Sequence, residues 1–249
     1  MSEHEDGIPP VLAAAWGLRE RPVKGPRPGL TLERIVAAGV KVAATDGLGA
    51  VSMGRVAREL GAATMSLYRY VTTKDELLEL MVDAAIGQPP PVPPGGGWRA
   101  GLTSFARAYL DLLRRQSWVI RVPFNSPPIM PNQIAWMNYG LATMGGTALR
   151  QDERLFAIMI VSGIVRNWAL LAADINAAAQ AGGVTTEQAM FGYGRLLKRL
   201  ADPARFPAVG ELVASGVLET PEGPDDDFEF GLARFLDGLE ALIRNRETP

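Results

Sequence analysis

The alternation of apolar and polar positions predicts helices along most of this chain. After Thr31, the expected N-cap, apolar or small side chains recur at positions 32, 35, 36, 39, 40 and 43, which form one face of a helix that stops near Asp46. Two short helical segments follow. Ser52 is expected to cap the first, over residues 52–60, which ends at Gly61, and the second covers residues 64–71. A fourth begins with the capping box Thr73–Glu76 and runs to about Ile86.

The stretch Gln88–Gly97, QPPPVPPGGG, is the clearest boundary in the chain, because it can form neither a helix nor a central strand. Further helices are predicted beyond it, at Trp98–Gln116, Asn132–Met144, Asp152–Gln180, Thr186–Leu200, Ala208–Ser215 and Asp226–Arg246. No alternating strand pattern bounded by hairpin turns occurs. We therefore expect an all-α fold with a flexible basic arm over residues 1–29, a first domain over 30–87 and a second over 98–249.

Composition narrows the chemistry. The 249 residues include no cysteine and one histidine, His4, so thiol nucleophiles, Cys-ligated metals and most histidine-based catalysis have no residues to work with. The formal net charge of −2 is unevenly spread, because residues 19–74 hold ten Lys/Arg and four Asp/Glu. A basic block on an otherwise acidic chain suggests that one module meets a polyanion, although such a bias is often only a solvated face.

The segments 52–60 and 64–71 have the proportions of a helix-turn-helix, in which the second helix enters the major groove of DNA. Its side chains suit that task. Thr64, Met65, Ser66 and Arg69 offer hydroxyls, an apolar tip and a guanidinium to base edges, and Tyr68, Tyr70 and Lys74 can reach phosphates. Leu67 and Val71 would anchor the helix from behind. Two ordinary core helices would show the same spacing.

These residues carry a resemblance to a known family. Thr31–Ile86 resembles the DNA-binding region of the tetracycline-repressor (TetR) family, in the segments LERIVAAGVKVAATDGL, VSMGRVARELGA and above all SLYRYVTTKDELLELM. The resemblance implies that Ser52 also contacts the phosphate backbone, together with Tyr68, Tyr70 and Lys74. Three positions depart from the family pattern: Tyr70 replaces a common His, Ala63 a capping Ser, and Gly54 a base-reading Arg in some members.

By the same resemblance, Trp98–Pro249 is expected to bind a small molecule and to dimerise. Aromatic and sulfur-containing side chains could line an apolar pocket, although most could equally be plain core. The residues predicted for this pocket are Phe105, Tyr109, Trp118, Phe124, Trp136, Met137, Met144, Met159 and Trp168.

Two long helices carry more apolar surface than one small domain can cover. Asp152–Gln180 is apolar on nearly every side and is expected to be buried all round. In the TetR family the last long helices pair across a two-fold axis, so the second helix, 226–246, is expected at a homodimer interface; an intrachain contact is the alternative. The residues predicted there are Phe235, Leu236, Leu239, Leu242 and Ile243.

The resemblance implies a ligand-responsive transcriptional regulator, usually a repressor, which binds a palindromic operator in double-stranded DNA as a homodimer and is released by a small apolar or aromatic effector. The alternatives are a regulator without an effector and a small-molecule-binding helical bundle without a role on DNA. An enzyme ranks third, and no cofactor or metal is expected. The acidic N-terminus and an apolar stretch of only eleven residues, 155–165, favour a cytoplasmic protein over a secreted or membrane one.

Overall fold

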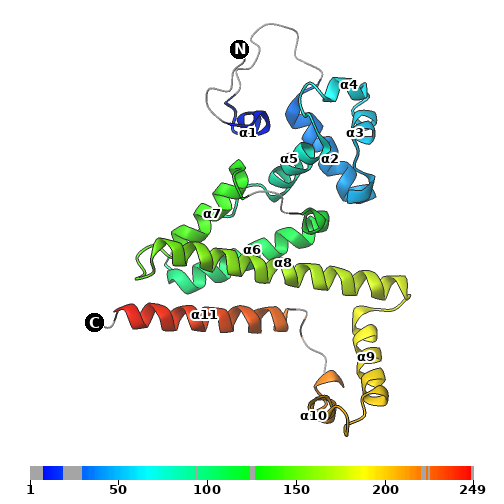
Figure 1. The fold of residues 1–249 in the computed structure, drawn as a ribbon, viewed down its shortest axis with the longest axis vertical. Helices are drawn as coiled ribbons and strands as arrows, with labels where there is room; N and C mark the ends of the chain where they lie inside the picture. The colour runs from blue at the N-terminus through cyan, green and yellow to red at the C-terminus, as the bar shows by residue number, and fades with distance from the viewer. Residues whose placement is uncertain are drawn as a thin grey trace.

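The computed structural model describes residues 8–18, 30–92, 95–123, 127–219, 223 and 225–247, and every regular element within them is helical (Figure 1). The longer elements are α2 (Leu32–Asp46), α5 (Lys74–Ile86), α6 (Gly97–Arg115), α7 (Pro131–Thr143), α8 (Gln151–Ala181), α9 (Thr186–Leu200) and α11 (Asp226–Glu247). The shorter ones are α1 (Pro10–Ala15), η1 (Leu48–Ala50), α3 (Met53–Glu59), α4 (Thr64–Leu67), η2 (Ser117–Arg121), α10 (Pro207–Ala214) and η3 (Val217–Glu219). The expected all-α fold is confirmed, and the helices beyond residue 97 lie within one residue of their predicted bounds.

Helices α2 to α5 form a small unit around a dry core, whose fully buried members include Ile35, Val42, Leu67, Leu77 and Met81. Three of the helices begin at a predicted capping residue. The hydroxyls of Thr31, Ser52 and Thr73 each accept a hydrogen bond from the backbone N–H three residues later, at 3.1–3.2 Å. The capping box differs by one position from the prediction, because the Glu76 carboxylate accepts from the N–H of Thr72.

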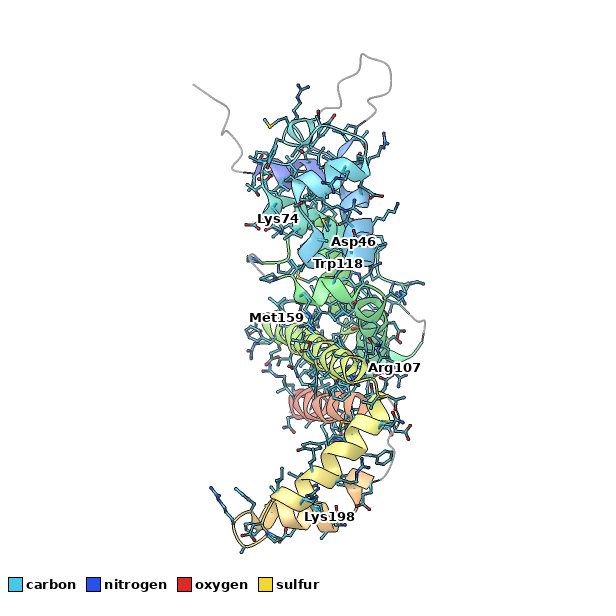
Figure 2. All side chains as sticks on the ribbon, turned by 90° about the vertical axis from the view of Figure 1, so that its right-hand side faces the viewer. Asp46, Lys74, Arg107, Trp118, Met159 and Lys198 are labelled. Carbon is cyan, nitrogen blue, oxygen red and sulfur yellow. The ribbon has the colours of Figure 1, made fainter. Side chains whose placement is uncertain are left out.

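The remaining helices form a larger unit that α5 joins to the first. Figure 1 shows α6, α7 and α8 beside the end of α5, with α11 running along α8; Figure 2 shows α9 and α10 at the end of the molecule farthest from α3 and α4. Small residues let these helices approach one another. A Cβ on Gly101 would lie 2.7 Å from the Cβ of Thr143, and one on Gly140 would lie 2.9 Å from Ile158. The α6–α7 and α7–α8 crossings are therefore close-packed.

Arginines along α6 pair with carboxylates at the start of and along α11. Arg99 donates to Asp237 at 2.6 Å and to Glu240 at 3.3 Å, Arg107 donates to Glu229 at 2.7 Å, and Arg114 pairs with Asp225. All of these side chains are substantially exposed, so each pair contributes little free energy. The pairs are compatible with the register that the buried apolar side chains of α11 impose.

The arm predicted over residues 1–29 contains regular structure where it is described, which corrects the expectation there. Helix α1 starts at Pro10, a favourable first helical residue, and packs Val11, Leu12 and Ala15 against the core beside α5. The indole N–H of Trp16 then donates to the carbonyl of Ile129 at 2.9 Å. The rest of the arm lies outside the described residues.

Helix α8 is not buried all round, contrary to the prediction. Its inner face, with Ala157, Val161 and Val165, is buried, whereas Phe156 and Met159 are 55% and 62% exposed. Among the described helices α8 is long and apolar enough to cross a membrane by length and composition, which is weak evidence because such helices also occur in soluble cores. In Figure 2, Met159 lies at the edge of the molecule.

Helix α11 also differs from its prediction. Leu236, Leu239 and Ile243, which were expected between two chains, are buried within this one, together with Phe228 and Leu232. The alternative of an intrachain core contact holds for these three side chains. Phe235 and Leu242 are partly buried and remain at the edge of that core. The reason is geometric: α8 lies along α11 and covers the side of the helix that carries these three residues.

We expect Leu236→Glu to unfold the second unit instead of merely separating two chains. The leucine is 2% exposed in a single chain, so the glutamate would bury a charge without a partner, at a cost of at least about 3 kcal/mol. Thermal unfolding followed by circular dichroism measures the effect. A folded Leu236→Glu monomer with an unchanged melting temperature would contradict this placement.

Candidate functional site

Helices α3 and α4 form the predicted helix-turn-helix at one end of the molecule (Figure 1). The turn between them needs a glycine, because Gly61 has φ = +63°, a conformation that other L-residues rarely adopt. The N–H of the next residue, Ala62, donates to the carbonyl of Ala57 and closes the end of α3. Leu67 and Val71, both almost fully buried, anchor the second helix as predicted.

The second helix is shorter than the predicted 64–71. Only Thr64–Leu67 is α-helical, and no side chain caps its start, because Ala63 occupies the capping position. Beyond Leu67 the chain continues in hydrogen-bonded turns, in which the N–H groups of Tyr70 and Val71 both donate to the Leu67 carbonyl. Residues 68–71 thus stay close to a helical path without forming a second regular turn.

The four side chains predicted to contact bases lie in or just after α4. Met65 is 74% exposed, Arg69 is exposed, and Thr64 and Ser66 are half-buried. None of the four side chains forms a hydrogen bond or an ion pair with another residue in the part of the chain that the structure describes. They form a polar and apolar surface at the tip of the first unit. Their contact with bases stays a prediction.

The four predicted phosphate contacts divide into two groups. Ser52, Tyr68 and Lys74 are exposed, and Lys74 is the first residue of α5. Tyr70 is a correction: its hydroxyl donates to the carbonyl of Leu30 at 2.9 Å, and its ring packs against the core. A phenol has one proton to donate and a phosphate only accepts, so this hydroxyl is committed to the protein.

An ion-pair network that sequence reasoning missed holds α3 against α2. Arg55 donates to Asp46 and to Glu59, each at 2.9 Å, and Lys41 lies 2.7 Å from Glu59. The hydrogen bonds from Lys41 and Arg55 lower the pKa of the Glu59 carboxyl. Two of the basic side chains in the cationic block therefore serve the fold. The spacing of Arg55 and Glu59, four residues apart on a helix, was the available signal.

In the second unit, four aromatic rings from α6 and α7 pack as one cluster, which we call the aromatic cluster: Phe105, Tyr109, Trp136 and Tyr139. Their centroids are 5.5–6.2 Å apart in tilted, stacked and edge-to-face arrangements. Three of the four were predicted to line a pocket, and the structure brings them together. Tyr139 was not predicted.

The other predicted pocket residues are scattered. Trp118 and Met144 are buried, and the Trp118 indole donates to Gln116 at 3.0 Å. Met137 and Trp168 are half-buried. Met159 is a correction, because its side chain is exposed on α8. Phe124 lies outside the described residues.

Three buried side-chain polar atoms have no hydrogen-bond partner in the described structure, and one of them belongs to the aromatic cluster. They are the hydroxyl of Tyr139, the indole N–H of Trp168 and Nε of Arg154. Burial raises the pKa of the Tyr139 phenol, so this hydroxyl is protonated at neutral pH and is available as a donor. An unpaired buried donor costs free energy, which a ligand that accepts its hydrogen bond would recover.

A separate apolar groove of about 500 Å³ lies between α8 and α11. Three predicted interface residues, Phe235, Leu239 and Leu242, line it together with Phe156 and Ile160. None of the predicted pocket residues does. A Cβ built on Gly163, Gly231 or Gly238 of these two helices would meet no atom within 4 Å.

Within the described residues, no group of three or more His, Asp and Glu could hold a metal ion.

Comparison with known proteins identifies the family. Residues 35–81 match the family described as "Bacterial regulatory proteins, tetR family", and residues 90–243 match "Tetracyclin repressor-like, C-terminal domain". The chain is 38% identical over 241 residues to the HTH-type transcriptional repressor DrrR1 of Streptomyces coeruleorubidus, which covers 95% of this chain and 87% of that protein. The chain therefore belongs to the TetR family.

Solved structures of a family member agree with this assignment. The chain resembles ActR of Streptomyces coelicolor in complex with actinorhodin, with 25% identity, a TM-score of 0.70 and coverage of 85% of this chain and 97% of that one. ActR in complex with (S)-DNPA gives 25% identity, a TM-score of 0.68 and coverage of 86% and 98%. The protein is a TetR-family transcriptional repressor whose first unit binds DNA and whose second unit is the ligand-binding domain. The alternative of a bundle without a role on DNA is not supported.

Arg69→Ala and Lys74→Ala should impair DNA binding in different ways. Arginine can contact O6 and N7 of one guanine, so Arg69→Ala should cost about 1–3 kcal/mol on the operator and relax base preference at one position of each half-site. Lys74→Ala should weaken operator and random DNA equally and reduce the salt slope by about one per subunit. Titrations of operator and scrambled duplex over a range of salt concentrations measure both.

Tyr70→Phe is the matched control for these variants. It removes only the hydrogen bond to Leu30, so it should lower the melting temperature by a few degrees and leave the salt slope unchanged. Two outcomes would contradict the assignments: a reduced salt slope for Tyr70→Phe, or an Arg69→Ala variant that loses affinity for both duplexes equally and keeps its base preference.

Proposed function

We propose that this repressor binds a palindromic operator as a homodimer and leaves it when a small apolar or aromatic effector enters the ligand-binding domain. One observation carries the DNA-binding part: α4 and the turns that follow it present Met65 and Arg69 to solvent, while Leu67 and Val71 are buried. Two such surfaces related by a two-fold axis fit successive major grooves, about 34–36 Å apart. Such a repressor acts in the cytoplasm.

The exposed faces of α8 and α11 support the homodimer. Phe156, Met159 and Ile160 on α8 are each about half exposed or more, and they continue into the groove lined by Phe235 and Leu242. A soluble monomer rarely exposes so continuous an apolar surface. Gly163, Gly231 and Gly238 leave space for a neighbouring helix to come close. A second copy packed on this face would form a bundle of four helices, two from each chain.

Phe156→Glu should convert the dimer to a folded monomer. The side chain is exposed in the single chain, so the variant should keep its helical content and melt cooperatively. In a dimer the same charge would be desolvated at the interface, which should abolish association at low micromolar concentration. Sedimentation velocity measures the change, and Val92→Glu, another exposed apolar residue, is the control. A Phe156→Glu variant that remains a stable dimer would place the interface elsewhere.

The aromatic cluster supports an effector site. Four rings are gathered on α6 and α7, and the unpaired hydroxyl of Tyr139 is a hydrogen-bond donor for a carbonyl or hydroxyl oxygen of an aromatic compound. ActR, which this chain resembles, has been solved with actinorhodin and with (S)-DNPA. An effector of that kind would release DNA only if it binds the DNA-free conformation more tightly than the DNA-bound one.

Actinorhodin should raise the melting temperature and weaken operator binding in the same concentration range. At 100 times its Kd, a ligand that binds only the folded protein adds about 2.7 kcal/mol of stability. Tyr139→Phe should weaken actinorhodin binding by about 2–10-fold, as expected for one lost hydrogen bond, without changing operator affinity in its absence. Titration calorimetry measures the affinity for actinorhodin. Tyr193→Phe, which changes an exposed tyrosine on α9, is the control. If neither actinorhodin nor a panel of aromatic compounds has any effect, a regulator without an effector is the better interpretation.

A further inference from the structure

Asp83, near the end of α5, is a charged side chain that the proposed DNA and effector contacts leave unexplained. It is 6% exposed, and its carboxylate faces the start of α7. Oδ1 accepts hydrogen bonds from the backbone N–H groups of Asn132 and Gln133, each at 3.0 Å, and Oδ2 accepts from the side-chain amide of Asn132 at 3.1 Å. That amide also donates to the backbone carbonyl of Asp83 at 2.9 Å.

These contacts complete a cap that α7 provides only in part. The side-chain oxygen of Gln133 accepts from the N–H of Met130 at 3.3 Å, and the N–H groups of Asn132 and Gln133 are left to Asp83. The capping position holds Met130, whose thioether is a poor acceptor, and the first helical residue is Pro131, which has no N–H. The next two N–H groups both donate to Asp83, on another helix. A carboxylate at a helix N-terminus is favoured by the helix dipole, which offsets part of the cost of burying its charge.

The pKa of Asp83 reflects both influences. Burial raises it, and the hydrogen bonds from Gln133 and Asn132 oppose the rise. The ionised form is the one that can accept all of these hydrogen bonds at once, so the contact depends on an intact carboxylate.

Trp136 makes a second connection between the same two helices. Its indole N–H donates to the carbonyl of Gly87, the residue that ends α5, at 3.0 Å. Its ring belongs to the aromatic cluster, with centroids 5.5 Å from Tyr109 and 5.6 Å from Phe105. The last turn of α5 is therefore hydrogen-bonded, at Asp83 and Gly87, to the first turns of α7. One of these bonds comes from a ring of the proposed effector site.

We propose that Asp83, Asn132 and Trp136 are positioning residues that couple effector binding to the orientation of the DNA-binding unit. The inference rests on the proposed function. An effector that enters the aromatic cluster moves the Trp136 indole, the Gly87 carbonyl loses its donor, and the start of α7 shifts against Asp83. Because α5 begins at Lys74, directly after the turns that follow α4, a tilt of α5 changes the separation of the two recognition surfaces in a dimer.

The test compares the wild-type protein with Asp83→Ala, Asp83→Asn and Asn132→Ala, and with Glu79→Ala, one turn earlier on α5, as the matched control. The DNA is a duplex that the wild-type protein selects from a random pool, and the effector probe is actinorhodin. For each protein, the Kd of the duplex is measured with and without saturating actinorhodin, and the Kd of actinorhodin is measured without DNA. The ratio of the two duplex Kd values is the coupling.

In the wild-type protein and Glu79→Ala we expect a coupling of about 5–150-fold. In Asp83→Ala and Asn132→Ala the ratio should fall toward one, with each separate Kd changed by less than about threefold. Asp83→Asn, which keeps one acceptor oxygen, should retain part of the coupling. A structural role alone would change stability and leave the ratio intact. Equal ratios in the variants and the wild-type protein would overturn the inference.

A second measurement needs no effector. Binding of the duplex should slow hydrogen exchange of the amides in residues 130–137 of the wild-type protein, because a fixed α5 holds the start of α7. In Asn132→Ala the same peptide should no longer respond, whereas peptides from α3 and α4 should slow as before. A wild-type protein that binds the duplex without any change at 130–137 overturns the coupling. Failure to select any duplex, or an actinorhodin-insensitive wild-type protein that still shows the exchange response, counts against the proposed function instead.

Discussion

The arrangement of the two units depends on the hydrogen bonds that one buried carboxylate, that of Asp83, accepts. Asp83 lies where the first unit meets the second, and a charge so deeply buried is tolerated only with several hydrogen-bond donors around it. The donors come from α7, whose own Gln133 side chain caps only the N–H of Met130. Each helix thus supplies what the other lacks, and the α5–α7 contact is fixed in register as well as in distance. An apolar contact alone would permit sliding, whereas this one has a single arrangement.

The same contact between α5 and α7 connects the proposed effector site to the DNA-binding unit. Helix α7 brings the Asn132 amide to α5 and places Trp136 and Tyr139 among the aromatic rings a turn or more further along. The proposed effector site and the support of the DNA-binding unit therefore lie one to two turns apart on one helix. Close packing at Gly101 and Gly140 leaves α7 little freedom to deform, so a displacement at one end is transmitted along its axis.

Local chemistry could be predicted from the sequence, and distant pairing could not. The bounds of the helices beyond residue 97, the caps at Thr31, Ser52 and Thr73 and the glycine turn at Gly61 depend on residues a few positions apart, and the structure agrees with them. Tyr70 was misjudged because its partner, Leu30, lies 40 residues away. Asp83 escaped notice because its donors lie 49 and 50 residues later, in a segment that reads as an ordinary helix start.

The long helices show the same limit. Periodicity reveals which residues share a face, and it does not reveal what covers that face. Leu236 and Met159 illustrate this: the first was expected between chains and is buried within one, and the second was expected in a pocket and is exposed. Which of these side chains is buried follows from the position of α11 along α8, and the sequence does not show that position. Three of the four rings of the aromatic cluster were predicted, because they are spaced along helices that pack closely.

Two tryptophans whose fluorescence can be measured lie at the contact between α5 and α7. Of the five tryptophans, Trp136 donates its indole N–H to Gly87 at the end of α5, and Trp16, the residue after α1, donates to Ile129, just before α7. Trp136 is buried and Trp16 is about half exposed, so the two indoles have surroundings of different polarity. The ultraviolet emission of the native chain thus contains a contribution from the place where its two units join, without any attached dye.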